Sequence, residues 1–116
     1  MNKKYILKKS YDIEKLLKDK KSVGSKYYVI YYKFSESEIP QIAVSVSKRV
    51  GNAVTRNHEK RIIREIIKNY ISRLNKINML FVVKPNSLDL TYINKKEQID
   101  YLLKKILKQG EKNEKF

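Results

Sequence analysis

The spacing of hydrophobic residues changes several times along the chain, and each spacing predicts a different kind of element. Residues 27–34 (YYVIYYKF) and 41–47 (QIAVSVS) are rich in alternating β-branched or aromatic side chains, a pattern typical of strands. Residues 79–83 (MLFVV) are continuously apolar, and the Asn and Pro residues that bound them favour a buried strand over a helix. A short additional strand is expected near residues 22–26.

Alternation gives each of the two longer strands two different faces, because successive side chains point to opposite sides. In the second strand, the alternate residues Ile42, Val44 and Val46 are expected to point into the core. Both faces of the first strand need cover. One face carries Tyr28, Ile30, Tyr32 and Phe34, and the other carries Tyr27, Val29 and Tyr31.

Helical spacing, with apolar residues three or four positions apart, occurs in three segments. Near the N-terminus, Ser10 or Asp12 can cap a short helix that ends near Lys20. A long amphipathic helix follows the Gly-Asn turn and is expected over residues 54–74. Its apolar stripe comprises Ile63, Ile66, Ile67, Tyr70 and Leu74.

A last helix is expected near the C-terminus. Thr91 or Asn94 can cap its first turn, and Gly110 is expected to end it, because glycine commonly terminates helices. Its apolar residues follow the spacing of a helix face that packs into a core. They are Ile99, Leu102, Leu103, Ile106 and Leu107.

These elements follow the order α, β, β, β, α, β, α when the short strand is included. The order predicts a single α+β domain over residues 1–116, in which a small sheet packs against helices. Residues 1–9 and 110–116 are expected to be flexible tails. A right-handed connection is the physical default where a helix joins two parallel strands.

The charge of the chain is strongly unbalanced, since 27 Lys and Arg residues oppose 12 Asp and Glu residues and give a formal net charge of +15. Such an excess attracts nucleic acid or an anionic membrane. Membrane is the weaker alternative, because no run approaches the roughly 18 apolar residues of a spanning helix. The chain has no cysteine and its first residues lack a signal-peptide core, so a cytoplasmic location is expected.

Residues 47–65 concentrate this charge on the central helix. Arg56, Lys60, Arg64 and Lys68 recur at every fourth position, so a helix places them in one stripe. The stripe lies beside the apolar residues of the same helix, so one face can enter a core while the other meets a polyanion. A solvated basic face is the alternative, but solvated faces usually mix charges and favour lysine.

The same segment reads S-K-R-V-G-N-A-V-T-R-N-H-E-K-R-I-I-R-E. This string resembles the signature of the bacterial ribonuclease P protein subunit, S-K-K/R-x-G-N-A-V-x-R-N-R-x-K-R-x-x-R-E, at nearly every fixed position. One position departs, since His58 stands where the family has the second arginine of its Arg-Asn-Arg core. The resemblance implies the αβββαβα fold of that family, with a left-handed crossover in place of the right-handed default.

The resemblance implies that the chain is the protein subunit of ribonuclease P, which removes the 5′ leader of precursor tRNA to give the mature tRNA 5′ end. In the family, a magnesium-dependent RNA subunit performs the hydrolysis, so Mg2+ would be held mainly by the RNA. The implied partners are this catalytic RNA and precursor tRNA, with no membrane and no obligate protein partner. The implied RNA-binding residues are Lys48, Arg49, Asn52, Arg56, Asn57, His58, Lys60, Arg61, Arg64 and Lys68.

The resemblance also implies a second surface, a cleft between the first helix and the sheet that in the family holds the single-stranded leader. Tyr31 aligns with an aromatic position of that cleft, and Tyr27 shares its strand face. Aromatic side chains can stack on bases without sequence preference, although half-buried strand tyrosines are often structural. Ile13 and Leu17 stand where the family often has phenylalanines, and a leader contact and a core position are equally expected for them.

The polypeptide itself offers no arrangement of catalytic residues. A nuclease needs a carboxylate cluster for metal ions or paired acid–base groups, whereas this chain has one histidine and scattered carboxylates. We therefore predict no catalytic residue and no metal site on the protein. Two other classes stay open: a ribosomal RNA-binding protein, which the signature disfavours, and a DNA-binding regulator, for which no preceding helix or dimerisation heptad is visible.

Overall fold

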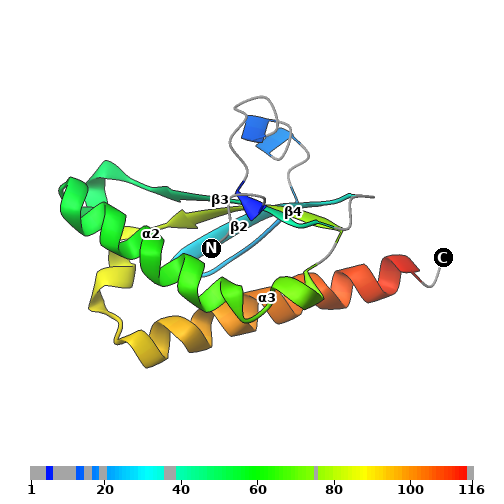
Figure 1. Cartoon of the computed structure of the whole chain (residues 1–116). Coiled ribbons are helices and arrows are strands. Elements are labelled where there is room, and N and C mark those ends of the chain that lie inside the picture. Colours follow the sequence, from blue (N-terminus) through cyan, green and yellow to red (C-terminus); the bar gives the residue numbers. More distant parts are fainter. Residues whose placement is uncertain are drawn as a thin grey trace.

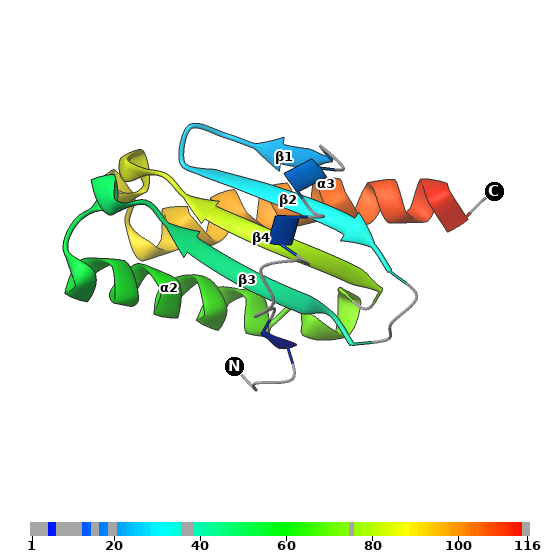
Figure 2. The same cartoon turned by 90° about the horizontal axis from the view of Figure 1, so that it is seen from above.

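A four-stranded mixed sheet forms the centre of the molecule (Figure 2). The computed structural model describes residues 5–6, 13–14, 17–18, 21–35, 39–74 and 76–114, with side chains up to residue 109. The strands lie in the order β1 (Ser22–Gly24), β2 (Tyr28–Phe34), β4 (Ile77–Val83) and β3 (Gln41–Val46). Both β1 and β4 pair antiparallel with β2, whereas β3 pairs parallel with β4.

Two long helices cover one face of this sheet, and the N-terminal segment lies on the other (Figure 1). α2 (Ala53–Lys68) lies between β3 and β4 in the chain and packs against β3, while α3 (Tyr92–Glu114) packs against β1 and β2. Short 3-10 turns join the elements: η2 (Lys48–Val50), η3 (Ile71–Arg73) and η4 (Pro85–Asp89). The predicted α+β class is confirmed.

We call the face of the sheet that meets α2 and α3 the inner face, and it carries the main hydrophobic core. Alternation along the strands directs every second side chain into this core, as predicted. The strands contribute Tyr28, Ile30, Tyr32, Ile42, Val46, Ile77, Met79, Phe81 and Val83. The long helices contribute Ile63, Ile66, Ile67, Ile99, Leu102, Leu103 and Ile106.

The opposite face, which we call the outer face, has a much smaller core. Among the residues that the structure describes, Ala43 and Leu80 are buried there, and Ile13, Tyr31 and Val82 pack against them. Ile13, near the N-terminus of the chain, therefore covers part of the outer face. The two faces of one sheet therefore differ greatly in how much apolar surface they bury.

The N-terminal segment is described at only a few positions. Residues 13–14 and 17–18 are helical, in agreement with the predicted first helix, whose caps and C-terminal end lie outside the described residues. Ile6 forms a parallel β-bridge with Ile42, so the segment passes beside β3. Most of the predicted flexible tail at residues 1–9 also lies outside the described residues.

Two predicted helix ends are wrong. α2 ends at Lys68 and not at Leu74, because η3 keeps Tyr70 and Leu74 in the core and so continues the apolar spacing beyond the helix. α3 passes through Gly110 and continues to Glu114. One glycine inside a helix costs only about 1 kcal/mol relative to alanine, which a long helix packed on a core can accommodate.

Strand boundaries differ less from the prediction. The short strand near residues 22–26 is present as β1. β4 begins at Ile77 and not at Met79, because Ile77 pairs with Phe34 at the end of β2. The left-handed sense of the connection from β3 through α2 to β4 stays a prediction.

Candidate nucleic-acid interface

The turn between β3 and α2 fixes where the basic helix begins. Ser47 Oγ accepts a hydrogen bond from the Arg49 N–H (3.2 Å), and Asn52 Oδ1 accepts one from the Thr55 N–H (3.0 Å), so Asn52 caps α2. Gly51 has a φ of 154°, and a Cβ there would lie 3.1 Å from the Thr55 Cβ. A larger residue at position 51 would therefore strain the turn that starts the helix.

Five of the predicted RNA-binding residues come together along one side of α2. With Glu65, which the sequence prediction omitted, they line a shallow hollow that we call the basic pocket. The five residues are Asn57, Lys60, Arg61, Arg64 and Lys68. Four positive charges and one negative charge therefore share this lining, which suits the binding of phosphate groups.

The other predicted RNA-binding residues lie outside this pocket. Lys48, Arg49 and Asn52 are exposed in the turn before α2. His58 is exposed on α2 but does not line the pocket. Arg56 is half-buried, and its Nε is a buried atom with no hydrogen-bond partner among the described residues. The stripe predicted from basic residues at every fourth position is therefore present, and its members differ in solvent exposure.

A second hollow, which we call the outer-face cleft, opens between the N-terminal segment, the edge of the sheet and α2. Ile13 and Leu17 line its N-terminal side, and residues 43–46 of β3 line its sheet side. Lys60 and Arg64 line the cleft as well as the basic pocket. The two hollows therefore lie on either side of these two cationic side chains.

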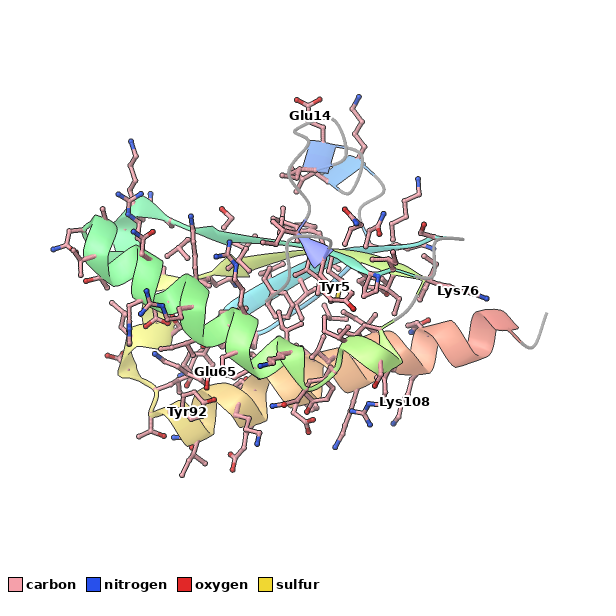
Figure 3. All side chains as sticks on the ribbon, viewed as in Figure 1. Tyr5, Glu14, Glu65, Lys76, Tyr92 and Lys108 are labelled. Carbon is pink, nitrogen blue, oxygen red and sulfur yellow. The ribbon has the colours of Figure 1, made fainter. Side chains whose placement is uncertain are left out.

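The walls of the cleft are partly exposed and mainly apolar. Leu17 is 44% exposed, an unusual environment for a leucine that packs in a core. Glu14 points away from the sheet (Figure 3) and so leaves the apolar side of its segment to the cleft. The sequence prediction missed the small residues Ala43 and Ser45, although alternation in the second strand had placed them on the face opposite the core.

The structure separates the two tyrosines that the sequence grouped together. Tyr31 lies on the outer face and packs beside Ala43 and Leu80. Tyr27 precedes β2, packs partly against the inner-face core, and has the Lys26 ammonium 5.1 Å from its ring centre. Its backbone N–H donates to Ser25 Oγ, so a turn interrupts the strand alternation there.

The residues that the structure describes contain no group of three or more His, Cys, Asp or Glu side chains that could hold a metal ion. None of the described helices is long and apolar enough to cross a membrane. The side chains that line the two hollows are cationic, amide and apolar, with the Glu65 carboxylate and the Ser45 hydroxyl in addition.

Comparisons with known proteins agree with this geometry. The family model described as Ribonuclease P matches residues 1–107. The chain belongs to the ribonuclease P protein family. It is 41% identical to the ribonuclease P protein component of Acholeplasma laidlawii over 89% of this chain and 90% of that relative. It is 33% identical to the corresponding component of Mycoplasma capricolum over 91% of this chain and 99% of that relative.

A solved structure supports the same assignment. The RNase P protein of Staphylococcus aureus superposes with a TM-score of 0.80 and is 31% identical, covering 86% of this chain and 93% of that one. As a ribonuclease P protein component, the chain is part of the ribonucleoprotein enzyme that matures the 5′ end of tRNA. Ribonuclease P RNA is accordingly its partner.

Proposed function

We propose that the chain binds the catalytic RNA through α2 and the turn before it, and binds the 5′ leader of precursor tRNA in the outer-face cleft. The observation that carries this proposal is that Lys60 and Arg64 line both hollows. A single-stranded leader in the cleft would then lie directly beside the RNA held by α2. The protein would act where substrate and catalytic RNA meet.

The basic surface suits structured RNA. Helical RNA exposes phosphates and 2′-hydroxyls but little readable base edge, so it is recognised mainly by charge and shape. Arg61 and Arg64 can each form paired hydrogen bonds to phosphate oxygens, and the exposed Lys48 and Arg49 extend the charge beyond the start of α2. Much of the binding free energy would come from counterions released by these contacts.

The outer-face cleft suits a single strand. Proteins bind single-stranded RNA by stacking bases on aromatic or apolar side chains while cations hold the backbone. Leu17 and Ile13 provide apolar surface, and Tyr31 packs beside the cleft on the same face of the sheet. Lys60 and Arg64 provide the cations at its border.

Hydrolysis would be performed by the RNA with its own Mg2+, in the cytoplasm, and the polypeptide alone would have no nuclease activity. The described residues contain no metal-binding cluster, and the only histidine, His58, is exposed on the basic helix. A positive charge of +15 would instead reduce repulsion between the two RNAs. The protein should therefore matter most when magnesium is scarce.

Reconstitution tests this proposal. Ribonuclease P RNA is mixed with precursor tRNA at limiting and at saturating Mg2+, with and without the purified protein. We expect the protein to restore cleavage at limiting Mg2+ and to show no cleavage without the RNA. Specific 5′ cleavage by RNA-free protein that survives further purification would contradict the proposed division of labour.

A further inference from the structure

The two halves of α2 are held in the fold by different kinds of contact. The buried residues of the helix are Glu59, Ile63, Ile66 and Ile67. The isoleucines all lie in the C-terminal half and enter the main core. In residues 53–62, which we call the basic half, Ile62 packs partly against the core, and the one fully buried side chain is that of Glu59, which is 2% exposed.

The contact that holds Glu59 is an ion pair with α3. Lys95 Nζ lies 2.8 Å from Glu59 Oε1, and Lys95 is itself 7% exposed. Lys95 belongs to the first turn of α3. Thr91 caps this helix, because its Oγ1 accepts a hydrogen bond from the Asn94 N–H (3.2 Å). The Lys95 N–H donates to the Thr91 carbonyl (2.9 Å). The basic half of α2 is thus tied to a well-defined helix start beneath it (Figure 1).

The surroundings leave Glu59 dependent on Lys95. Tyr28 is buried nearby. Its burial, and to a lesser extent the charge of Glu59, raises the pKa of the Tyr28 hydroxyl far above the usual range, so this hydroxyl stays neutral. The Ser87 hydroxyl lies beside that of Tyr28, and neither has a hydrogen-bond partner of good geometry within the described part of the chain. Glu59 Oε2 has no partner among the described residues either.

Net stability is a poor explanation for such a pair. The cost of removing two charges from water usually offsets their attraction, and apolar pairs of similar volume are often as stable or more so. A pair of this kind can instead define a single arrangement, because its attraction depends on direction and distance. In some proteins a buried polar or ionic group specifies one arrangement in this way.

We propose that Glu59 and Lys95 are positioning residues that fix the orientation of the basic half of α2 and so determine how tightly it binds RNA. Neither side chain needs to touch the RNA, because both are buried. The pair sets the direction of the exposed Asn57 and Arg61, so that the RNA contacts form together. This inference rests on the proposed RNA-binding role of α2.

The decisive variant is Glu59→Gln in the full-length protein, measured for affinity to ribonuclease P RNA at fixed salt. It raises the formal net charge of +15 by one unit on the basic helix, so electrostatics alone predicts tighter binding. Positioning predicts the opposite sign, a several-fold weaker affinity. The matched control is Glu97→Gln, which removes an exposed carboxylate from α3 and should leave affinity unchanged or slightly raised.

A second variant separates positioning from stability. In Glu59→Leu with Lys95→Met, apolar side chains replace the pair, and the urea midpoint should stay the same or rise. RNA affinity should nevertheless fall, and amide hydrogen exchange should accelerate at residues 56–60 while residues 63–67 stay protected. Wild-type affinity and exchange in this variant, or unweakened binding by Glu59→Gln, would overturn the proposal.

Arg61→Ala distinguishes failure of this inference from failure of the proposed function. Arg61 is exposed in the basic pocket and has no part in the ion pair. If Arg61→Ala weakens RNA binding and Glu59→Gln does not, only the positioning role is refuted. If neither change alters RNA affinity, α2 is not the RNA-binding surface and both proposals are refuted.

Discussion

The inner and outer faces of the sheet are built from the same strands but bury very different amounts of surface. On the inner face, Tyr28, Ile30, Met79 and Phe81 have no solvent exposure, because α2 and α3 cover them. On the outer face, the buried cluster formed by the described residues consists of Ala43 and Leu80, with partly exposed neighbours. The apolar contacts that stabilise the fold therefore lie mainly on the inner face, and the outer face keeps partly exposed apolar surface that a ligand can contact.

The largest expected effect comes from neighbouring residues of β4 that point to opposite faces. Phe81→Ala on the inner face should lower the free energy of unfolding by ~3–5 kcal/mol, because it leaves a cavity in the main core. Val82→Ala, one position later and half-buried on the outer face, should cost much less. Urea unfolding of both variants measures the difference. Equal losses would mean that the outer face is as important for folding as the inner one.

An intermediate effect should separate the two tyrosines. If a leader base stacks on Tyr31, Tyr31→Ala should weaken binding of precursor tRNA relative to mature tRNA by ~1–3 kcal/mol. Tyr27 contacts the inner-face core, so Tyr27→Ala should lower the free energy of unfolding and weaken the binding of precursor and mature tRNA equally. Affinities of the holoenzyme for the two tRNAs provide the measurement. If Tyr27→Ala selectively weakened the binding of precursor tRNA, Tyr27 would be a leader contact, as the sequence suggested.

The smallest effect concerns the Tyr28 hydroxyl on the inner face. Burial raises its pKa in the folded state, whereas an unfolded tyrosine releases its proton near pH 10. Above about pH 10 the unfolded state binds fewer protons than the folded state, so stability should fall as pH rises through that value. Tyr28→Phe should remove this part of the alkaline loss and leave the dependence between pH 7 and 9 unchanged. If the free energy of unfolding fell equally above pH 10 in the wild type and in Tyr28→Phe, this prediction would be contradicted.

Much of the fold was predictable from the sequence because alternation and helical spacing are local signals. The inner-facing residues of β2 and β3 follow directly from them. The end of α2 was not predictable, because η3 continues the apolar spacing as far as Leu74. The packing of Tyr27 against the inner-face core was not predictable either, because the Ser25 turn interrupts an alternation that is continuous in the amino-acid sequence.

The candidate site was predicted unevenly for a similar reason. The basic stripe follows from spacing and from the family signature, and the structure places three of its four members, Lys60, Arg64 and Lys68, along one pocket. The Glu59–Lys95 pair had no sequence signal. A glutamate among arginines and lysines is typical of a solvated surface, and its partner lies on another helix far along the chain. Burial of such a pair depends on how α2 and α3 pack together.

The position of β4 has a consequence for how the chain assembles on the ribosome. β2 and β3 are consecutive in the chain but do not pair with each other; both pair with β4, which is synthesised last of the strands. The register joins Tyr28 to Val83, so the sheet requires contacts between distant parts of the sequence, which slow folding. A nascent chain that stops before β4 would expose the basic α2 helix beside unpaired strands. Binding of ribonuclease P RNA to the completed fold would stabilise the finished protein by mass action.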